Sequence, residues 1–291
     1  MADPSLKQKI DSGHFIAAPG VFDMMSLKIA NRVGFDAIYA SGYWLTASYL
    51  GLPDAGIATY TDMINRVGKV CELSTAPVIA DADTGYGGLL NLHHTVIGYE
   101  KAGVSGFQFE DQQFPKQCGH VGKRQVISKE DMVEKIQVAV EARSDTAMQI
   151  IARTDARSSN GLSEAIDRGQ AYAAAGADLV FVEALQSEEE MRTVCQEIDK
   201  PQLANMANGG DTPILDVDTL KSLGYSAAIF PAMTTLAAMA AVEKALRQFK
   251  ATGSSVHDDI EHFDFADMCQ MMGFDEVHEL EARWRDRKLR S

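Results

Sequence analysis

Helical patterns and short apolar runs alternate along the chain in a fixed order. Four segments consist of a helical pattern, a glycine and then an apolar run, at residues 27–40, 97–111, 169–184 and 220–232. The glycine follows the last helical turn, where a left-handed residue commonly ends a helix, and β-branched or aromatic residues begin within about four positions. The pattern therefore predicts one helix–turn–strand unit that recurs.

Further apolar runs lie between these copies, and helical patterns separate nearly every pair. Together they predict eight strands, near residues 14–18, 37–40, 77–80, 106–109, 149–153, 179–182, 202–204 and 227–230. Strands that are apolar on both faces and are followed by helices indicate a parallel sheet covered by helices. Eight units over roughly 240 residues match a (β/α)8 TIM barrel. A doubly wound sheet is the alternative, but no G-x-G-x-x-G motif follows the first strand.

The chain after Gly253 follows a different pattern. A polar stretch, GSSVHDD, precedes apolar residues at helical spacing from Phe263 to Phe274. We therefore expect a barrel domain over residues 1–252 and a C-terminal helical tail over residues 253–291. The apolar face of this tail needs a cover, and a neighbouring subunit is the simplest one.

Composition narrows the class of protein. The chain has 291 residues, 46% of them hydrophobic and 23% charged, with a formal net charge of −14. This acidic balance, without a dense Lys/Arg run, argues against nucleic acid as a partner. The first 14 residues lack the apolar core of a signal peptide, and the most apolar stretch, 227–242, is too short to span a membrane, so we expect a cytoplasmic protein. The four cysteines form no closely spaced pair, so no structural disulfide is implied.

Polar residues gather just after the predicted strands, where a (β/α)8 barrel has its active site. In chain order they are Asp81, Asp83, Glu110, Asp111, Arg153, Asp155, Glu183 and Asn205. Asp81 and Asp83 stand two positions apart, so in an extended backbone they point to the same side. A paired carboxylate suits Mg²⁺, with Glu110 as a further acceptor behind it. Helix capping is the structural alternative for Asp83.

Arg153 closes an otherwise apolar strand. A guanidinium in this position suits bidentate binding of a substrate carboxylate. A structural ion pair with Glu183 is the alternative, and the two roles are compatible.

The polar segment 114–128 follows the fourth predicted strand and is expected to form a lid. Cys118 lies in this segment among Lys116, His120, Lys123 and Arg124. Such an electropositive setting favours a thiolate or an acid–base function for the thiol. A chemically inert loop cysteine is the alternative.

An ordered set of short motifs runs through these positions. It consists of SGY at 41–43, LGLPDAGI with Asp54, ADADTGYG, FEDQ, KQCGH, ARTDA, VEA and LAN. Over residues 14–250 the set resembles the isocitrate lyase/phosphoenolpyruvate mutase superfamily. The resemblance implies a barrel that depends on Mg²⁺, with Mn²⁺ as a substitute, and whose eighth helix is exchanged between the subunits of a dimer. Such dimers commonly form homotetramers, an arrangement that would cover the tail.

The resemblance also implies a set of site residues. Mg²⁺ would be held by Asp81 and Asp83, and Asp54 and Glu110 would reach it largely through water. The residues implied to contact the substrate are Ser41, Gly42, Tyr43, Gly119, Arg153, Glu183 and Asn205.

The KQCGH motif indicates the branch of the superfamily. Cys118 matches the general acid of the lyases, with His120 beside it, although Gln117 replaces the usual Lys or Arg. Phosphonate-processing members typically lack this cysteine, so the resemblance favours carbon–carbon cleavage. Tyr39 would be the base that removes the C2 hydroxyl proton, and a buried tyrosine hydrogen bond is its structural alternative.

Substrate choice within the lyases depends on charge. Isocitrate and methylisocitrate have three carboxylates, and Leu236 and Phe265 stand where methylisocitrate lyases carry arginines for the third. The segment SGYWLTASYLGLPD resembles a loop of 2-alkylmalate lyases. The implied reaction converts a 2-alkylmalate, such as 2,3-dimethylmalate, to a 2-oxo acid such as pyruvate and a carboxylic acid. The alternatives are an oxaloacetate hydrolase or decarboxylase, a 2-methylisocitrate lyase, and a catalytically silent dicarboxylate-binding or assembly protein.

Overall fold

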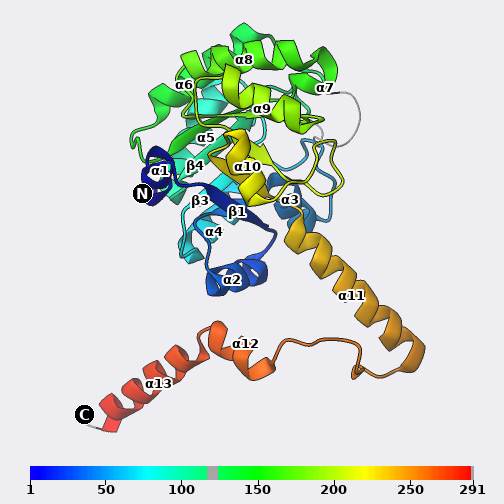
Figure 1. Cartoon of the computed structure of the whole chain (residues 1–291). Coiled ribbons are helices and arrows are strands. Elements are labelled where there is room, and N and C mark those ends of the chain that lie inside the picture. Colours follow the sequence, from blue (N-terminus) through cyan, green and yellow to red (C-terminus); the bar gives the residue numbers. More distant parts are fainter. Residues whose placement is uncertain (117–123, 290–291) are drawn as a thin grey trace. The chain divides into compact units, whose positions relative to one another are not determined.

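The computed structural model describes residues 1–116 and 124–289 (Figure 1). By their internal contacts the residues divide into two compact units, Met1–Thr235 and Leu236–Ser291. The described strands all belong to the first unit. The expected domain boundary after residue 252 stays a prediction.

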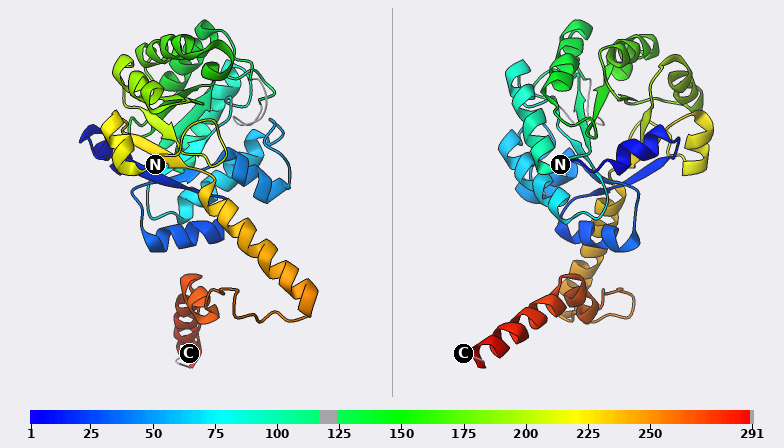
Figure 2. Two further views of the ribbon diagram at one scale, coloured as in Figure 1. Left: turned by 45° about the vertical axis from the view of Figure 1, so that its right-hand side comes forward. Right: turned by 90° about the vertical axis from the view of Figure 1, so that its left-hand side faces the viewer.

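In the described part of the chain, eight parallel strands form a nearly closed barrel (Figure 2). The strands are β1 (Ile16–Val21), β2 (Ile38–Ala40), β3 (Val78–Asp81), β4 (Gly106–Glu110), β5 (Gln149–Thr154), β6 (Leu179–Val182), β7 (Leu203–Asn205) and β8 (Ala227–Phe230). They pair in the order β6-β5-β4-β3-β2-β1-β8-β7. A parallel bridge between Val180 and Gln202 brings β6 next to the start of β7. The predicted (β/α)8 barrel is therefore confirmed.

The eight predicted strands match the observed ones, and β1 differs most. Its prediction stopped at residue 18, because Pro19 and Gly20 interrupt the apolar pattern, but the strand continues to Val21. It pairs with β8 up to Pro19 and with β2 from Gly20 onward. A Cβ atom at Gly20 would lie 2.4 Å from the Pro231 carbonyl oxygen, so the close approach of these backbones requires glycine.

Helices surround the barrel (Figure 2). Those of the first unit are α1 (Ser5–Asp11), α2 (Met24–Val33), α3 (Gly42–Leu50), α4 (Tyr60–Leu73), α5 (Leu89–Ala102), α6 (Lys129–Ala142), α7 (Ala156–Asn160), α8 (Leu162–Ala174), α9 (Glu188–Glu197) and α10 (Val217–Leu223). As predicted, glycines end helices ahead of strands. Gly103 and Gly224 adopt left-handed conformations at the C-caps of α5 and α10, and β4 and β8 follow directly.

Helix α1 covers the amino-terminal end of the barrel. Its Leu6 and Ile10 are buried. They share one hydrophobic cluster with the first residues of four strands, Ile16, Leu179, Leu203 and Ala227. Just before β2, Asp36 forms an ion pair with Lys9 of α1, in which Lys9 Nζ lies 2.7 Å from Asp36 Oδ1. The lumen is therefore filled by side chains at this end, as is usual for the fold.

The second unit is helical, as the tail pattern predicted. It contains most of α11 (Met233–Thr252), together with α12 (Phe265–Met271) and α13 (Phe274–Leu289). Large apolar side chains on these helices are exposed, among them Leu246, Phe265, Val277 and Trp284. The neighbouring subunit and the exchanged eighth helix stay predictions. None of the described helices combines the length and apolar character that crossing a membrane requires.

Candidate active site

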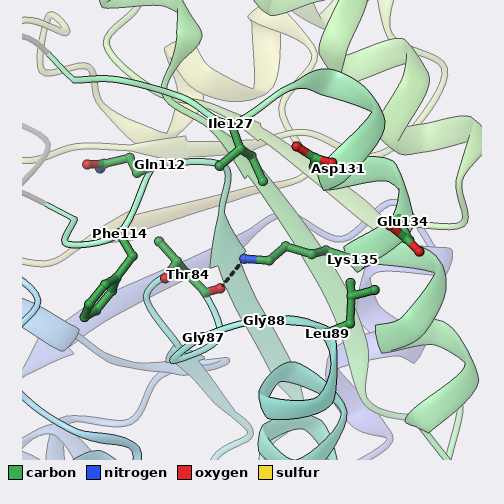
Figure 3. Close-up of a pocket in the computed structure, with 10 residues that line it drawn as sticks. All are labelled: Thr84, Gly87, Gly88, Leu89, Gln112, Phe114, Ile127, Asp131, Glu134 and Lys135. Carbon is green, nitrogen blue, oxygen red and sulfur yellow. Dashed lines mark hydrogen bonds between the residues drawn. The ribbon is translucent and has the colours of Figure 1, made fainter.

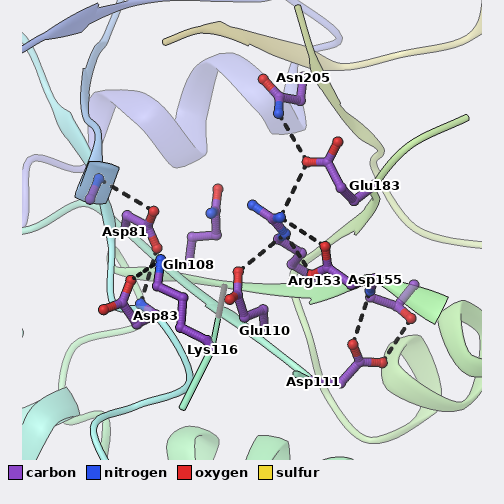
Figure 4. A network of polar contacts seen from close by, with 12 residues as sticks. Asp81, Asp83, Gln108, Glu110, Asp111, Lys116, Arg153, Asp155, Glu183 and Asn205 are labelled. Atoms are coloured by element: carbon purple, nitrogen blue, oxygen red, sulfur yellow. Dashed lines mark hydrogen bonds and ion pairs between the residues drawn. The ribbon is translucent and has the colours of Figure 1, made fainter. Parts of the chain in front are cut away.

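Charged and polar side chains meet at the carboxyl ends of the strands (Figure 4). Asp81 ends β3, Glu110 ends β4, Arg153 lies near the end of β5, Glu183 follows β6 and Asn205 ends β7. All five are more than nine-tenths buried. Because parallel strands present their carboxyl ends on the same side, side chains from distant parts of the sequence form one cluster.

Asp81 and Asp83 are brought together by a turn. The strand ends at Asp81, and Asp83 has a φ of 49°, in the left-handed region. The same-side argument for an extended backbone therefore does not apply. Instead, the backbone N–H of Asp83 donates to Asp81 Oδ1 at 3.0 Å. A non-glycine residue in this region is strained, and such strain clusters at functional sites.

The start of α3 packs against Asp81. The Gly42 N–H donates to Asp81 Oδ2 at 3.3 Å, and a Cβ atom at Gly42 would lie only 2.7 Å from that oxygen. Ser41 is buried and does not cap α3 through its side chain. Tyr43 is partly buried and stacks on Trp44 with ring centroids 4.5 Å apart. The predicted substrate-contacting residues 41–43 therefore lie beside a predicted metal ligand.

A buried lysine lies among the carboxylates. Lys116 Nζ is 2.6 Å from Asp54 Oδ1 and 2.7 Å from Asp83 Oδ1, and its side chain is 3% exposed. Burial alone would lower the pKa of Lys116, but the surrounding carboxylates, Asp83 foremost, hold it well above its usual value. Burial raises the pKa of Asp83 to about 6, although Lys116 opposes the shift. The sequence suggested Lys116 only as a positive neighbour of Cys118.

Arg153 contacts three carboxylates. It donates two hydrogen bonds to Asp155, each 2.9 Å, and lies 3.3 Å from Glu110 Oε2 and 3.5 Å from Glu183 Oε2. The ion pair with Glu183 is present, but Asp155 is the closer partner. Arg124 also pairs with Asp155, at 2.7 Å. Burial alone would raise the pKa of Asp155, but the two guanidinium groups hold it below its usual value.

Asp111 holds the end of β5 and the adjoining Asp155 in place through hydrogen bonds. It accepts hydrogen bonds from the Asp155 N–H at 2.9 Å, the Thr154 hydroxyl at 2.7 Å, the Tyr172 hydroxyl at 2.7 Å and Arg168 Nη1 at 3.1 Å. Arg168 and Tyr172 belong to α8, so Asp111 ties β4, β5 and α8 together. Sequence reasoning missed Arg168 and Tyr172, because a helical pattern does not reveal which side chain meets which strand end.

Tyr39 lies deep in the cluster, 2% exposed. Its hydroxyl is 3.5 Å from Asp81 Oδ2 and accepts a hydrogen bond from Gln108 Nε2 at 3.2 Å. Burial and the Asp81 charge raise the pKa of Tyr39 well above its usual value, so at neutral pH it is a protonated donor. Its role as a base stays a prediction. Gln108 was not identified as a site residue from the sequence. A polar residue within the otherwise apolar run of strand GFQFE could have indicated it.

The residues fit an oxygen-preferring divalent ion. Across residues 1–116 and 124–289 no three His, Cys, Asp or Glu side chains converge into a ready-made metal cage. However, Glu110 Oε1 is buried and finds no hydrogen-bond partner among the described residues. The available donors are carboxylate oxygens, and Mg²⁺ typically binds one or two carboxylates together with waters. A fourth predicted ligand, Asp54, is paired with Lys116.

Cys118, Gly119 and His120 fall in 117–123, outside the described residues. The residues on either side of this segment are both buried and ion-paired. Lys116 contacts Asp54 and Asp83, and Arg124 contacts Asp155. The described residues Lys116 and Arg124 therefore both belong to the strand-end cluster.

A cavity of about 280 Å³ lies beside the turn after β3 (Figure 3). Its lining includes Thr84, Gly87, Asp131 and Lys135. Lys135 Nζ donates to the Thr84 carbonyl oxygen at 2.8 Å, and burial lowers the pKa of this lysine. Lys135 therefore contacts this turn through a backbone carbonyl and not through a predicted metal-binding carboxylate.

Comparisons of the sequence agree with this geometry. The family model for phosphoenolpyruvate phosphomutase matches residues 6–250. A 2,3-dimethylmalate lyase from Eubacterium barkeri is 42% identical over 281 residues, which cover 96% of each chain. A 2-methylisocitrate lyase from Aeropyrum pernix is 42% identical over 249 residues, which cover 86% of this chain and 80% of the relative.

Solved structures give the same grouping. A 2,3-dimethylmalate lyase, described as a PEP mutase/isocitrate lyase superfamily member, has a TM-score of 0.91 at 34% identity, covering 97% of this chain and 96% of the other. An oxaloacetate acetylhydrolase with 3,3-difluorooxalacetate has a TM-score of 0.91 at 31% identity, covering 96% and 95%. A phosphonopyruvate hydrolase with oxalate and Mg²⁺ has a TM-score of 0.88 at 28% identity, covering 98% and 99%.

Proposed function

Since the chain belongs to the phosphoenolpyruvate mutase/isocitrate lyase superfamily of enzymes, we propose that it is a Mg²⁺-dependent lyase that cleaves the C2–C3 bond of a 2-alkylmalate. The products are a 2-oxo acid, such as pyruvate, and a carboxylic acid. 2,3-Dimethylmalate is the first substrate to test, because the relative named 2,3-dimethylmalate lyase is 42% identical in sequence and its alignment covers 96% of this chain.

One juxtaposition supports this proposal most directly. Asp81 and Asp83 lie on one side of the buried cluster, and Arg153 lies on the other with Glu183 and Asn205 (Figure 4). The carboxylates suit a hard divalent ion, and the guanidinium suits a substrate carboxylate. A 2-hydroxy diacid offers both kinds of group, because its hydroxyl and first carboxylate suit a metal and its second carboxylate suits an arginine.

The chain's own residues would divide the work as follows. Asp81 and Asp83 would hold the metal, with Asp54 and Glu110 acting through water. When bound, the ion would supply Lewis-acid stabilisation of oxygens on which negative charge gathers. A base would take the C2 hydroxyl proton, and the C2–C3 electron pair would stay with the departing carboxylic-acid fragment. Tyr39 is the candidate for this base, and it would act as the tyrosinate, after its own proton has left, because the neutral hydroxyl is a donor.

That fragment then needs a proton on carbon. Cys118 is the proposed donor, so the thiol becomes a thiolate as the carboxylic acid forms. The proton taken from the C2 hydroxyl returns the thiolate to its thiol form through solvent, and the atoms balance without an added oxidant or reductant. General acid catalysis of this kind contributes about 10²–10⁴-fold to a rate.

Oxaloacetate hydrolysis is a second candidate function. The specific observation in its favour is the TM-score of 0.91 with an oxaloacetate acetylhydrolase, equal to the score with 2,3-dimethylmalate lyase. Oxaloacetate is a diacid of similar size, so the same carboxylates and arginine would accommodate it. Product analysis separates the two reactions, because hydrolysis yields oxalate and acetate whereas the lyase yields a 2-oxo acid.

The test is a substrate panel with Mg²⁺, read by release of pyruvate or other 2-oxo acids and of oxalate. We expect 2,3-dimethylmalate to exceed isocitrate and 2-methylisocitrate in kcat/KM by at least about 10²-fold, or 2.7 kcal/mol. An unpaired third carboxylate costs several kcal/mol to desolvate, whereas an alkyl group gains about 0.8 kcal/mol per buried methylene. The expectation follows from the uncharged Leu236 and Phe265, and Leu236→Arg should narrow the gap.

Asp81→Ala is the control for this assay, since it should abolish Mg²⁺-dependent turnover while the protein stays folded. A preference for either tricarboxylate would contradict the alkylmalate proposal and favour a 2-methylisocitrate lyase. Oxalate release without cleavage of any alkylmalate would instead favour the hydrolase.

A further inference from the structure

We propose that Lys116 is a built-in counter-ion of the metal site that Mg²⁺ must displace, and that this lysine limits how tightly the metal binds. The inference rests on the metal dependence in the proposed function. It goes further because it assigns a role to a residue outside the predicted ligands and catalytic groups.

The contacts of Lys116 support this role. Its ammonium group pairs with Asp54 at 2.6 Å and with Asp83 at 2.7 Å, and the two carboxylates come from different loops. The lysine side chain is 3% exposed and each aspartate side chain is 9% exposed. Within the described residues, no other cation pairs with either aspartate. The lysine is therefore held inside the cluster rather than at its rim.

These contacts use oxygens that a metal would need. Asp83 is a predicted direct ligand and Asp54 a predicted ligand through water. Mg²⁺ binds oxygen at about 2.0–2.1 Å and demands near-octahedral geometry. A divalent ion and an ammonium group cannot both occupy the same face of the Asp83 carboxylate, because their like charges would meet at close range in a poorly solvated place.

The lysine also explains how the metal-free cluster tolerates burial. Asp81, Asp83 and Glu110 crowd one end of the barrel, and Asp54 lies close enough to share the Lys116 ammonium with Asp83, so their like charges repel one another. An ammonium among them offsets part of this repulsion, as a divalent ion would. Lys116 therefore stabilises the metal-free protein, and the same contacts weaken metal binding.

The experiment measures Mg²⁺ binding to the full chain by isothermal titration calorimetry, without substrate. Lys116→Met should bind Mg²⁺ at least tenfold more tightly than the wild type, equivalent to about 1.4 kcal/mol. Without metal its Tm should fall, and added Mg²⁺ should raise its Tm more than that of the wild type. Lys116→Arg keeps the charge and should bind Mg²⁺ within about threefold of the wild type.

Lys135→Met is the matched control for charge. Lys135 is also buried and contacts the same turn through the Thr84 carbonyl, but among the described residues it pairs with no carboxylate. Its loss should change the Mg²⁺ affinity less than threefold. If Lys116→Met does not fold, Lys116→Gln, which retains a hydrogen-bond donor without charge, replaces it in the titration.

Each other outcome overturns the inference in a distinguishable way. Equal or weaker Mg²⁺ binding by Lys116→Met, with normal binding by the wild type, would make Lys116 a structural residue or a metal-supporting one. If Lys135→Met gained as much Mg²⁺ affinity as Lys116→Met, the effect would come from the loss of any nearby positive charge and not from Lys116 in particular. If neither the wild type nor Lys116→Met binds Mg²⁺, the metal dependence of the proposed function fails, and the inference with it.

Discussion

Replacing Gly42 with alanine tests how strictly the start of α3 positions Asp81. The added Cβ atom would lie 2.7 Å from Asp81 Oδ2 and 3.0 Å from Asp81 Cγ, closer than non-bonded atoms tolerate. Asp81 must therefore shift by roughly 0.5–1 Å, or rotate away from the hydrogen bond that the Gly42 N–H donates to it.

The magnitude follows from these two effects. An off-rotamer side chain costs about 0.5–1.5 kcal/mol, and a hydrogen bond to a charged group contributes about 1.5–3 kcal/mol. If most of this loss falls on Asp81 as a metal ligand, kcat/KM should drop by about 10²-fold, or 2.7 kcal/mol, and Mg²⁺ binding should weaken in parallel. Fold stability should change little, because alanine favours a helix over glycine by up to about 1 kcal/mol.

The assay combines kcat/KM on the best substrate of the panel, Mg²⁺ titration and thermal unfolding. Gly88→Ala is the matched control, since Gly88 also stands at the start of a helix, has a φ of −77° and has no atom within 4 Å of an added Cβ. The reasoning is refuted if Gly42→Ala keeps kcat/KM and Mg²⁺ affinity within threefold of the wild type, or if Gly88→Ala loses as much as Gly42→Ala.

Two further predictions concern the acid and the buried ion pairs. Cys118→Ala should lower kcat by about 10²–10⁴-fold with little change in substrate affinity, and a change below threefold in steady-state kinetics would remove the thiol from the mechanism. Asp155→Asn removes the carboxylate that Arg153 and Arg124 share, so the free energy of unfolding at pH 7 should fall by about 3–5 kcal/mol. Because the pKa of Asp155 is lowered in the folded state, its contribution is present above about pH 4 and is lost as the pH falls further. Urea unfolding at pH 7 and near pH 3 measures this, and a wild-type advantage that does not shrink at the lower pH would contradict it.

The strand ends were predictable from sequence because a parallel barrel imposes one rule on all eight units. Asp81, Glu110 and Asn205 each end an apolar run, and the fold places such positions together whatever their separation in the chain. The glycines that end helices were predictable for a similar reason, since Gly103 and Gly224 follow helical patterns and precede strands. Here the hydrophobic pattern and the backbone preferences act in the same direction.

The contacts within the cluster were not predictable in this way. Asp83 adopts a left-handed conformation, although an extended backbone was assumed. Lys116 pairs with the carboxylates of Asp54 and Asp83, and Arg153 contacts Asp155 more closely than Glu183. A pattern of apolar and polar positions records which residues are buried, but turn geometry and rotamers decide which oxygen each cation reaches.

The amino-terminal helix α1 restricts the route by which molecules can reach the candidate active site. Because Leu6 and Ile10 fill the amino-terminal end of the barrel, the described residues leave no opening to Asp81 and Arg153 from that end. We therefore expect a substrate and both its products to pass the carboxyl-terminal end of the strands. We expect the fragment bound nearer the strand ends to leave second and to exclude the next substrate while it stays. Ordered release, with this product as a competitive inhibitor of the substrate, would then follow from the way α1 closes the far end of the barrel.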